Sequence, residues 1–296
     1  MKIKVSSCVE WPVPGDDPAG DQKIIDAAWR WHDAGITPVV VISPTRDMAF
    51  YDTLPLETSV GLKAGNVLTT TALKSGDLYN VAGWKMIFEQ FRARPLAREY
   101  RIENESVLNG GGAASPNFPG YWGSGIDAAR FESVLREALA GWCPVGKRFV
   151  WMTGFFNPGQ LGSFSVQRCL DTQRSIATVV RAVLDARFVT NELAKPPFAP
   201  NPGKFPDPKA NNDWFSASAK TVADVFADQE HVHETHVYDE VGCGVKPIGR
   251  RFWRRDEFDD AVRLAGARDL NITFDPGWRV WRDDLTVIDT WKAAMQ

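Results

Sequence analysis

Short apolar segments of extended-chain character alternate with amphipathic helical segments along this 296-residue chain. The clearest extended segment is the β-branched run at residues 37–43, which proline 44 ends. The clearest helical segment begins after Asp127 and carries Phe131, Val134 and Leu135 on one face. Strands separated by helices pair in parallel, because the chain must cross over the sheet to return in the same direction. The alternation therefore predicts an α/β fold built on a parallel sheet.

The alternation continues through eight extended segments and predicts a (β/α)8 TIM barrel. The predicted strands are residues 2–9, 37–43, 66–71, 98–106, 148–156, 187–191, 231–238 and 271–274. Besides the helix after Asp127, predicted helices are residues 21–34, 77–91, 166–186, 216–228, 256–267 and 284–295. The third strand rests on β-propensity alone. If it is wrong, an open doubly wound α/β sheet is the alternative architecture.

A single barrel-like catalytic domain is predicted over residues 1–296, because the sequence contains no internal repeat and no low-complexity tract. Long irregular segments at residues 44–65, 107–126 and 193–215 each follow a predicted strand. In a parallel barrel these loops share the rim at the carboxyl ends of the strands, where the active sites of this fold lie. Candidate functional residues are therefore expected at that rim.

The composition limits the partners of the protein. Its 34 Lys and Arg stand against 37 Asp and Glu, so the formal net charge of -3 argues against nucleic acid and anionic membranes as partners. No apolar run approaches the roughly 20 residues that span a bilayer. No signal peptide is visible at the N-terminus, so a cytoplasmic location is the default expectation. The 12 tryptophans predict a ring-stacking surface or a Trp-rich core, and the oligomeric state stays open.

Polar residues gather at the predicted carboxyl ends of the strands, and several of them are carboxylates. Hydrolysis of a glycosidic bond needs two carboxyl groups, one protonated to assist the leaving oxygen and one ionised to attack the anomeric carbon or to activate water. This rim therefore predicts a glycoside hydrolase. The candidate residues that would bind the sugar are Glu10, Trp11, Arg46, Asn104, Asn157, Tyr238 and Trp278.

The dipeptide Asn104-Glu105, at the end of the predicted fourth strand, resembles the Asn-Glu pair of (β/α)8 glycoside hydrolases that keep their acid/base there. The resemblance implies that Glu105 is the general acid/base and that Asn104 hydrogen-bonds the sugar 2-hydroxyl. It also implies a Glu nucleophile at the end of strand seven, where the sequence offers Glu240 or Glu234 and position favours Glu240. Trp278 resembles the platform tryptophan of that family. The implied mechanism is retaining.

Two further features of the sequence bear on this resemblance. The dipeptide recurs at Asn191-Glu192, so the match depends on the strand count. Residues 250–255 contain four arginines around two aromatic residues on the predicted rim. Because arginine pairs with carboxylates and sulfates in a bidentate way, this segment adds an acidic glycan to the expected carbohydrate substrates.

A histidine cluster supports an alternative function. His231, His233 and His236 fall within six residues, and on a strand the first two share one face. Two imidazoles at this spacing suit zinc, so the alternative is a metal-dependent hydrolase whose ligands are His231, His233 and Asp239 or Asp275. Thr235 stands where the HxHxDH motif has Asp, so the pattern departs from that motif. The glycosidase hypothesis needs no cofactor, and a third hypothesis is a non-catalytic barrel that binds a glycan or assembles with a partner.

Overall fold

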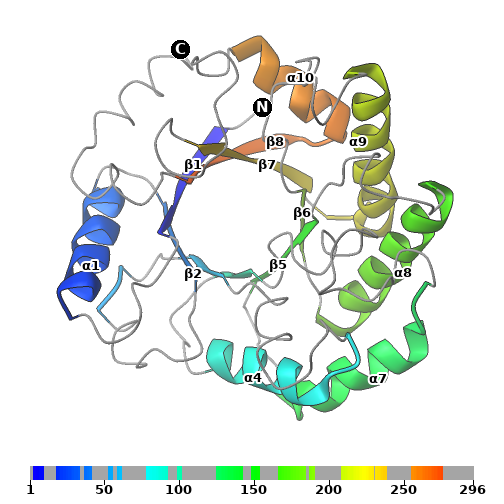
Figure 1. The fold of residues 1–296 in the computed structure, drawn as a ribbon, viewed down its shortest axis with the longest axis horizontal. Helices are drawn as coiled ribbons and strands as arrows, with labels where there is room; N and C mark the ends of the chain where they lie inside the picture. Colours follow the sequence, from blue (N-terminus) through cyan, green and yellow to red (C-terminus); the bar gives the residue numbers. More distant parts are fainter. Residues whose placement is uncertain are drawn as a thin grey trace.

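Eight short parallel strands form a closed ring in the computed structural model of the chain (Figure 1). The structure describes residues 3–9, 18–33, 37–41, 53–55, 59–61, 78–92, 99–101, 125–142, 148–153, 166–184, 187–190, 208–229, 231–238 and 255–275. The strands are β1 (Ile3–Val9), β2 (Thr37–Val41), β3 (Ser59–Gly61), β4 (Glu99–Arg101), β5 (Arg148–Thr153), β6 (Arg187–Thr190), β7 (His231–Tyr238) and β8 (Asp269–Asp275).

Each strand pairs in parallel with its sequence neighbour, and β1 also pairs with β8, which closes the sheet. The closing ladder runs from Ile3 opposite Leu270 to Ser7 opposite Phe274. An open doubly wound sheet would leave two edge strands, so the alternative architecture is wrong. The predicted alternation is met in part, since among the described residues a helix follows β1, β3, β4, β5, β6 and β7.

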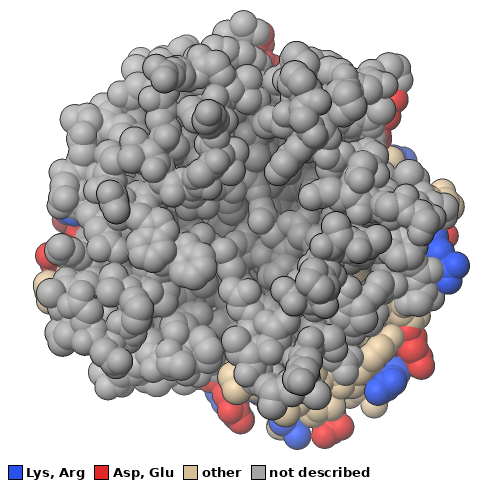
Figure 2. Space-filling model, viewed as in Figure 1, with Lys and Arg blue, Asp and Glu red and all other residues tan. Residues whose placement is uncertain are grey.

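The described helices surround the ring on its outer side (Figure 1). They are α1 (Pro18–Asp33), α4 (Val81–Arg92), α7 (Ala128–Leu139), α8 (Val166–Leu184), α9 (Pro208–Ala223) with the 3-10 turn η2 (Asp224–Phe226), and α10 (Arg255–Ala265). Within the described segments, no helix combines the length and the hydrophobicity needed to cross a bilayer. Acidic and basic residues lie at the edge of the molecule (Figure 2). On α7, Arg136 and Glu132 form an ion pair of 2.8 Å.

The start of α7 shows how the sequence fixes a helix end. The Asp127 side chain accepts a hydrogen bond of 3.0 Å from the backbone amide of Arg130, which has no carbonyl partner in the first turn. The backbone amide of Asp127 itself donates to the Tyr79 hydroxyl at 2.7 Å. The last turn ends at Ala140 and Gly141, both with positive φ. The helix predicted after Asp127 is therefore confirmed, with its cap.

The third strand was predicted wrongly. The place between β2 and β4 is taken by Ser59–Gly61, not by residues 66–71. This strand has only three residues, too few for a period-2 pattern to show in the sequence, and it lies inside the segment predicted as a loop at residues 44–65. The fourth strand is also shorter than predicted, since β4 covers Glu99–Arg101 within residues 98–106.

The helix predicted at residues 216–228 begins earlier, because α9 starts at Pro208 inside the predicted loop 193–215. Proline is tolerated at the first position of a helix, where its missing N–H would have no partner. The prolines of residues 193–215 predicted a loop, although one of them, Pro208, is the first residue of a helix. The predicted helix at residues 284–295 and the predicted loop at 107–126 lie outside the described residues, except Gly125 and Ile126 of that loop.

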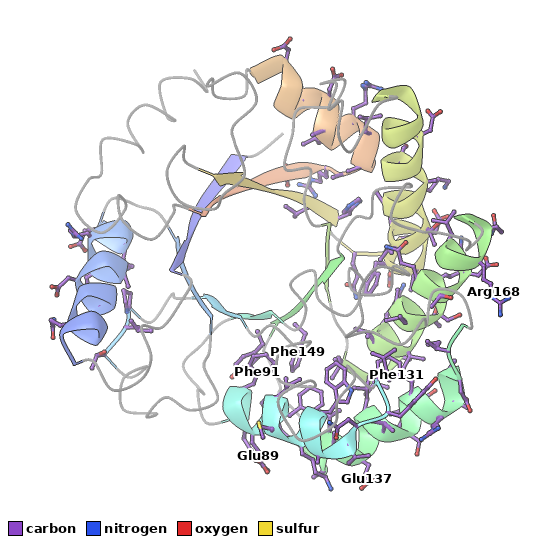
Figure 3. The ribbon with its side chains drawn as sticks, viewed as in Figure 1. Glu89, Phe91, Phe131, Glu137, Phe149 and Arg168 are labelled. Atoms are coloured by element: carbon purple, nitrogen blue, oxygen red, sulfur yellow. The ribbon has the colours of Figure 1, made fainter. Side chains whose placement is uncertain are left out.

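The described apolar core lies between the ring and the helices. Phe149 of β5 and Tyr100 of β4 are buried, with ring centroids 5.5 Å apart, and both contact Phe91 of α4, at 6.2 and 4.8 Å. Figure 3 shows Phe91 and Phe149 between α4 and the strands, with Glu89 and Glu137 on the far side of the helices. These contacts identify the helix-facing face of the sheet.

Candidate functional site

The closed parallel ring brings the carboxyl ends of all eight strands to one rim. The fourth strand from the N-terminus ends at Arg101, and Glu105 follows it by four residues in the sequence. The seventh ends at Tyr238, and Glu240 follows by two residues. The predicted site residues outside the described part of the chain are Glu10, Trp11, Arg46, Asn104, Glu105, Asn157, Asp239, Glu240 and Trp278.

The register assigns each strand position to one of the two faces of the sheet. Successive residues of a strand alternate between faces, and register partners on neighbouring strands share a face. Phe149 takes a helix-facing position on β5, so Trp151, two residues later, takes one as well. Trp151 is in register with Phe188 of β6, and Phe188 is in register with His231 of β7. His231 therefore occupies a helix-facing position. Applied from strand to strand around the ring, the register gives each position the same face whichever way round it is followed.

The opposite, interior face of β7, β8 and β1 is polar. On β8 the interior positions Asn271, Thr273 and Asp275 alternate with the helix-facing apolar positions Leu270, Ile272 and Phe274. The interior positions of β7 and β1 are Val232, Glu234, His236, Tyr238, Lys4, Ser6 and Cys8. The interior positions of β2, β5 and β6 nearest the rim are instead apolar: Val39, Val41, Val150, Met152 and Val189.

Two predicted site residues lie on this interior face. Glu234 is in register with Asn271, and Tyr238 with Asp275, the last residue of β8. Tyr238 ends β7, whereas Glu234 lies four residues earlier, about 13 Å along the strand. Glu234 therefore lies inside the barrel and Tyr238 at its rim.

The histidine cluster is divided between the two faces. His231 and His233 take helix-facing positions, and His236 takes an interior one. His231 is 8% exposed and sits at the amino end of β7. Burial lowers the pKa of His231 from 6.5 to about 4, and a hydrogen bond with the Gly266 backbone opposes part of the shift. Its imidazole is therefore neutral at neutral pH and lies away from the rim.

The described residues cover only part of the predicted zinc site. His231 and Tyr238 stand at opposite ends of the eight-residue strand β7, a span of about 23 Å, and Asp239 lies outside the described residues. The ligand set His231, His233 and Asp239 therefore stays a prediction. In the described part of the chain, no three His, Cys, Asp or Glu side chains are placed to hold a metal.

A cavity of about 190 Å³ lies elsewhere, between α4 and the carboxyl end of α7. Phe88 and Trp142 form its apolar part, with Lys85, Glu89 and Arg92 around them. Lys85 already pairs with Glu137 at 3.4 Å. This cavity is in the helical layer and not at the rim where the candidate residues follow their strands.

Sequence reasoning missed the interior positions His236, Asn271, Thr273 and Asp275 as a group. The alternation of β8 carried the signal, since every second residue from Asp269 to Asp275 is polar. What the pattern could not say is which of its two faces is inside the ring. The ladder between β7 and β8 supplies that information.

Comparisons with known proteins give a weak fold resemblance to glycoside hydrolases. No family model matches the sequence, and no curated protein does. The structure is similar to that of a "putative alpha-L-fucosidase" from Bacteroides thetaiotaomicron VPI-5482, at 11% identity, over 99% of this chain and 92% of that one, with a TM-score of 0.47. It is also similar to a mutant of the CcCel6A catalytic domain, at 13% identity, over 78% of this chain and 61% of that one, with a TM-score of 0.38.

A psychrophilic glycoside hydrolase family 10 endo-beta-1,4-xylanase is similar at 13% identity, over 67% of this chain and 70% of that one, with a TM-score of 0.31. The chain thus spans less than two thirds of the CcCel6A domain. Similarities of this size carry no weight for substrate or mechanism.

Proposed function

We propose that the protein is a (β/α)8 glycoside hydrolase that cleaves a carbohydrate by a retaining, two-carboxylate mechanism. Glu105 acts as the general acid/base, and Glu240 is the first candidate for the nucleophile, with Glu234 as the second. Asn104 binds the sugar 2-hydroxyl beside Glu105. The observation that carries the proposal is the strand order. In the sequence, Asn104-Glu105 follows the fourth strand of a closed parallel ring, and Asp239-Glu240 follows the seventh.

In this mechanism Glu105 protonates the oxygen of the leaving sugar while the nucleophile attacks the anomeric carbon. The resulting glycosyl-enzyme is then hydrolysed by water, from which Glu105 takes a proton. The two carboxyl groups must lie roughly 5 to 5.5 Å apart for this sequence of steps. The remaining candidates, Glu10, Trp11, Arg46, Asn157 and Trp278, would contact the sugar from other strands of the same rim.

The test is turnover of a panel of aryl glycosides by the wild type and by matched glutamine variants. Glu105→Gln should lower kcat by about 100-fold to 10,000-fold, because it removes the proton donor and base. Glu192→Gln is the control, since it changes the second Asn-Glu dipeptide, which follows β6. A wild type that cleaves no substrate of the panel, or two variants with equal losses, would contradict the proposal.

The measurement also separates the proposal from a non-catalytic glycan-binding barrel. Azide replaces a missing acid/base as a small anionic nucleophile on the glycosyl-enzyme, so it should restore turnover of an activated substrate by Glu105→Gln. The product is then a glycosyl azide with retained configuration. A barrel without catalysis gives no such product.

A further inference from the structure

The cavity between α4 and the carboxyl end of α7 lies near the end of the sheet opposite the rim. Arg92 ends α4 ahead of β4, and Leu139 ends α7 ahead of β5, so both helices lead into the amino ends of these strands. The volume of the cavity is about 190 Å³. A cavity of about 150 Å³ is large enough for benzene, so this one has room for an aromatic ring.

Two aromatic side chains form the apolar part of this cavity. Phe88 of α4 is 2% exposed, and its ring centroid lies 6.4 Å from that of Trp142, which is partly buried. The Trp142 ring also makes edge contacts with Tyr100 and Phe149, at 6.0 and 6.1 Å. These neighbours restrict the orientation of the indole. The cavity therefore offers a preformed aromatic surface to the ring of a ligand.

Four charged side chains lie around this surface, and two of them neutralise each other. Lys85 pairs with Glu137 at 3.4 Å. The other two, Glu89 and Arg92, line the cavity from α4, and in the described part of the chain neither takes part in an ion pair or a side-chain hydrogen bond. Positions three residues apart on a helix have Cβ atoms about 5–6 Å apart. The cavity thus presents one negative and one positive group side by side.

These groups select a ligand that carries both charges and a ring. A carboxylate alone would be attracted by Arg92 and repelled by Glu89, and an amine alone would meet the reverse. A free aromatic α-amino acid carries its carboxylate and its ammonium group on one carbon, with the ring beyond them.

We propose that the cavity binds a free aromatic amino acid. Arg92 pairs with the carboxylate of the amino acid, Glu89 pairs with its ammonium group, and Phe88 and Trp142 contact its ring. This binding needs no hydrolase activity at the rim.

The test follows the indole N–H signal of Trp142 by NMR while L-phenylalanine is titrated into isotope-labelled protein. The chain has 12 tryptophans, and Trp142→Phe identifies the signal. Trp29 of α1 is the internal control, because its indole N–H donates a hydrogen bond of 2.9 Å to the carbonyl oxygen of Thr53, away from the cavity. The expected result is a saturable shift at Trp142 and none at Trp29. Glycine, which has no ring to bury, should bind at least about tenfold more weakly.

Ligands with one charge test the two pairings separately. 3-Phenylpropionate lacks the ammonium group, and 2-phenylethylamine lacks the carboxylate. Each should bind about two- to fivefold more weakly than L-phenylalanine, the contribution expected of an exposed ion pair. Glu89→Gln should weaken phenylalanine by a similar factor and should not weaken 3-phenylpropionate. Arg92→Gln should do the same for phenylalanine without weakening 2-phenylethylamine.

Glu132→Gln and Arg136→Gln are the matched controls for these variants. They change the same residue types in an ion pair of α7 that does not line the cavity, so the dissociation constant of phenylalanine should stay unchanged. The site is refuted if phenylalanine leaves the Trp142 signal unmoved, or if the control variants weaken binding as much as Glu89→Gln and Arg92→Gln. Equal binding of phenylalanine and the two singly charged ligands also refutes it, because the cavity then selects the ring and not the two charges.

Discussion

The backbone amide of Arg268 donates a hydrogen bond of 3.1 Å to the carbonyl oxygen of His231. This bond links the turn after α10 to the first residue of β7, next to Gly266, whose backbone lies within hydrogen-bonding reach of the His231 ring. The amino end of β7 is thereby held against the helical layer. His231 is thus part of the packing at the end of β7 opposite the rim, where it is buried.

The buried imidazole of His231 should make the stability of the protein depend on pH. Its pKa is lowered from 6.5 to about 4, so between these values the unfolded state binds a proton that the folded state does not. The free energy of unfolding should therefore fall as the pH drops from 7 toward 4, by up to roughly 3 kcal/mol from this group. Urea denaturation at several pH values, on the wild type and His231→Gln, measures the difference.

His32→Gln is the control for this experiment, because His32 lies on α1 with a side chain that is 36% exposed. The carboxylates change the free energy of unfolding with pH in all three proteins. The contribution of His231 is therefore the difference in pH dependence between the wild type and His231→Gln, and His32→Gln should show no such difference from the wild type. Equal losses of stability in the wild type and His231→Gln between pH 7 and 5 would show that His231 is protonated as easily when folded as when unfolded.

Removal of the cap of α7 should destabilise the protein by about 1 kcal/mol. Asp127→Ala leaves the backbone amide of Arg130 without its side-chain acceptor, which now lies at 3.0 Å. Asp127→Asn keeps an acceptor oxygen and should cost much less. Thermal or urea unfolding distinguishes the two variants, and equal stabilities for Ala and Asn would mean that the cap contributes nothing.

Phe149 should be among the costly positions to truncate. It is 1% exposed and its ring meets those of Phe91, Tyr100 and Trp142 at 5.5 to 6.2 Å. Phe149→Ala should lower the free energy of unfolding by about 3–5 kcal/mol, and Phe149→Leu by less, since leucine fills more of the space. Wild-type stability in Phe149→Ala would place the core elsewhere than between β5 and the helices.

The two candidate nucleophiles should separate in a kinetic comparison. Glu234 lies about 13 Å inside the carboxyl end of β7, whereas Glu240 follows that end by two residues. Glu240→Gln should therefore lower kcat on an activated glycoside by about 100-fold or more, and Glu234→Gln should act mainly through KM. If Glu234→Gln abolishes the burst of leaving group and Glu240→Gln does not, the assignment is reversed.

Much of the fold could be predicted from the sequence, because the long elements carry clear periodicity. The predicted strand at residues 231–238 has the same two ends as β7. The predicted ends of α8 and α10 lie within two residues of the observed ones. The third strand was missed because Ser59–Gly61 has three residues, fewer than two repeats of the period-2 strand pattern. The start of α9 was missed for a different reason: Pro208 is a residue type common in loops, and here it begins a helix.

The candidate site could be predicted only as far as residue types and strand ends. An alternating strand such as β8 presents two faces, and nothing in its own sequence says which one is inside the ring. The strands that pair with it decide which face is inside, because register partners share a face, as Phe188 and His231 do. The alternation along β7 already separates His236 from His231 and His233, and the pairing partners decide that His236 takes the interior position.

The two faces of the sheet place different demands on the chain. Aromatic side chains such as Phe149 and Tyr100 hold the sheet to its helices on one face, while the other face carries Asn271 and its polar neighbours. Substitutions on the first face should lower the yield of folded protein, because they remove these ring contacts. The positions of the other face take no part in these contacts, so the sequence there can change without loosening the attachment of the sheet to its helices.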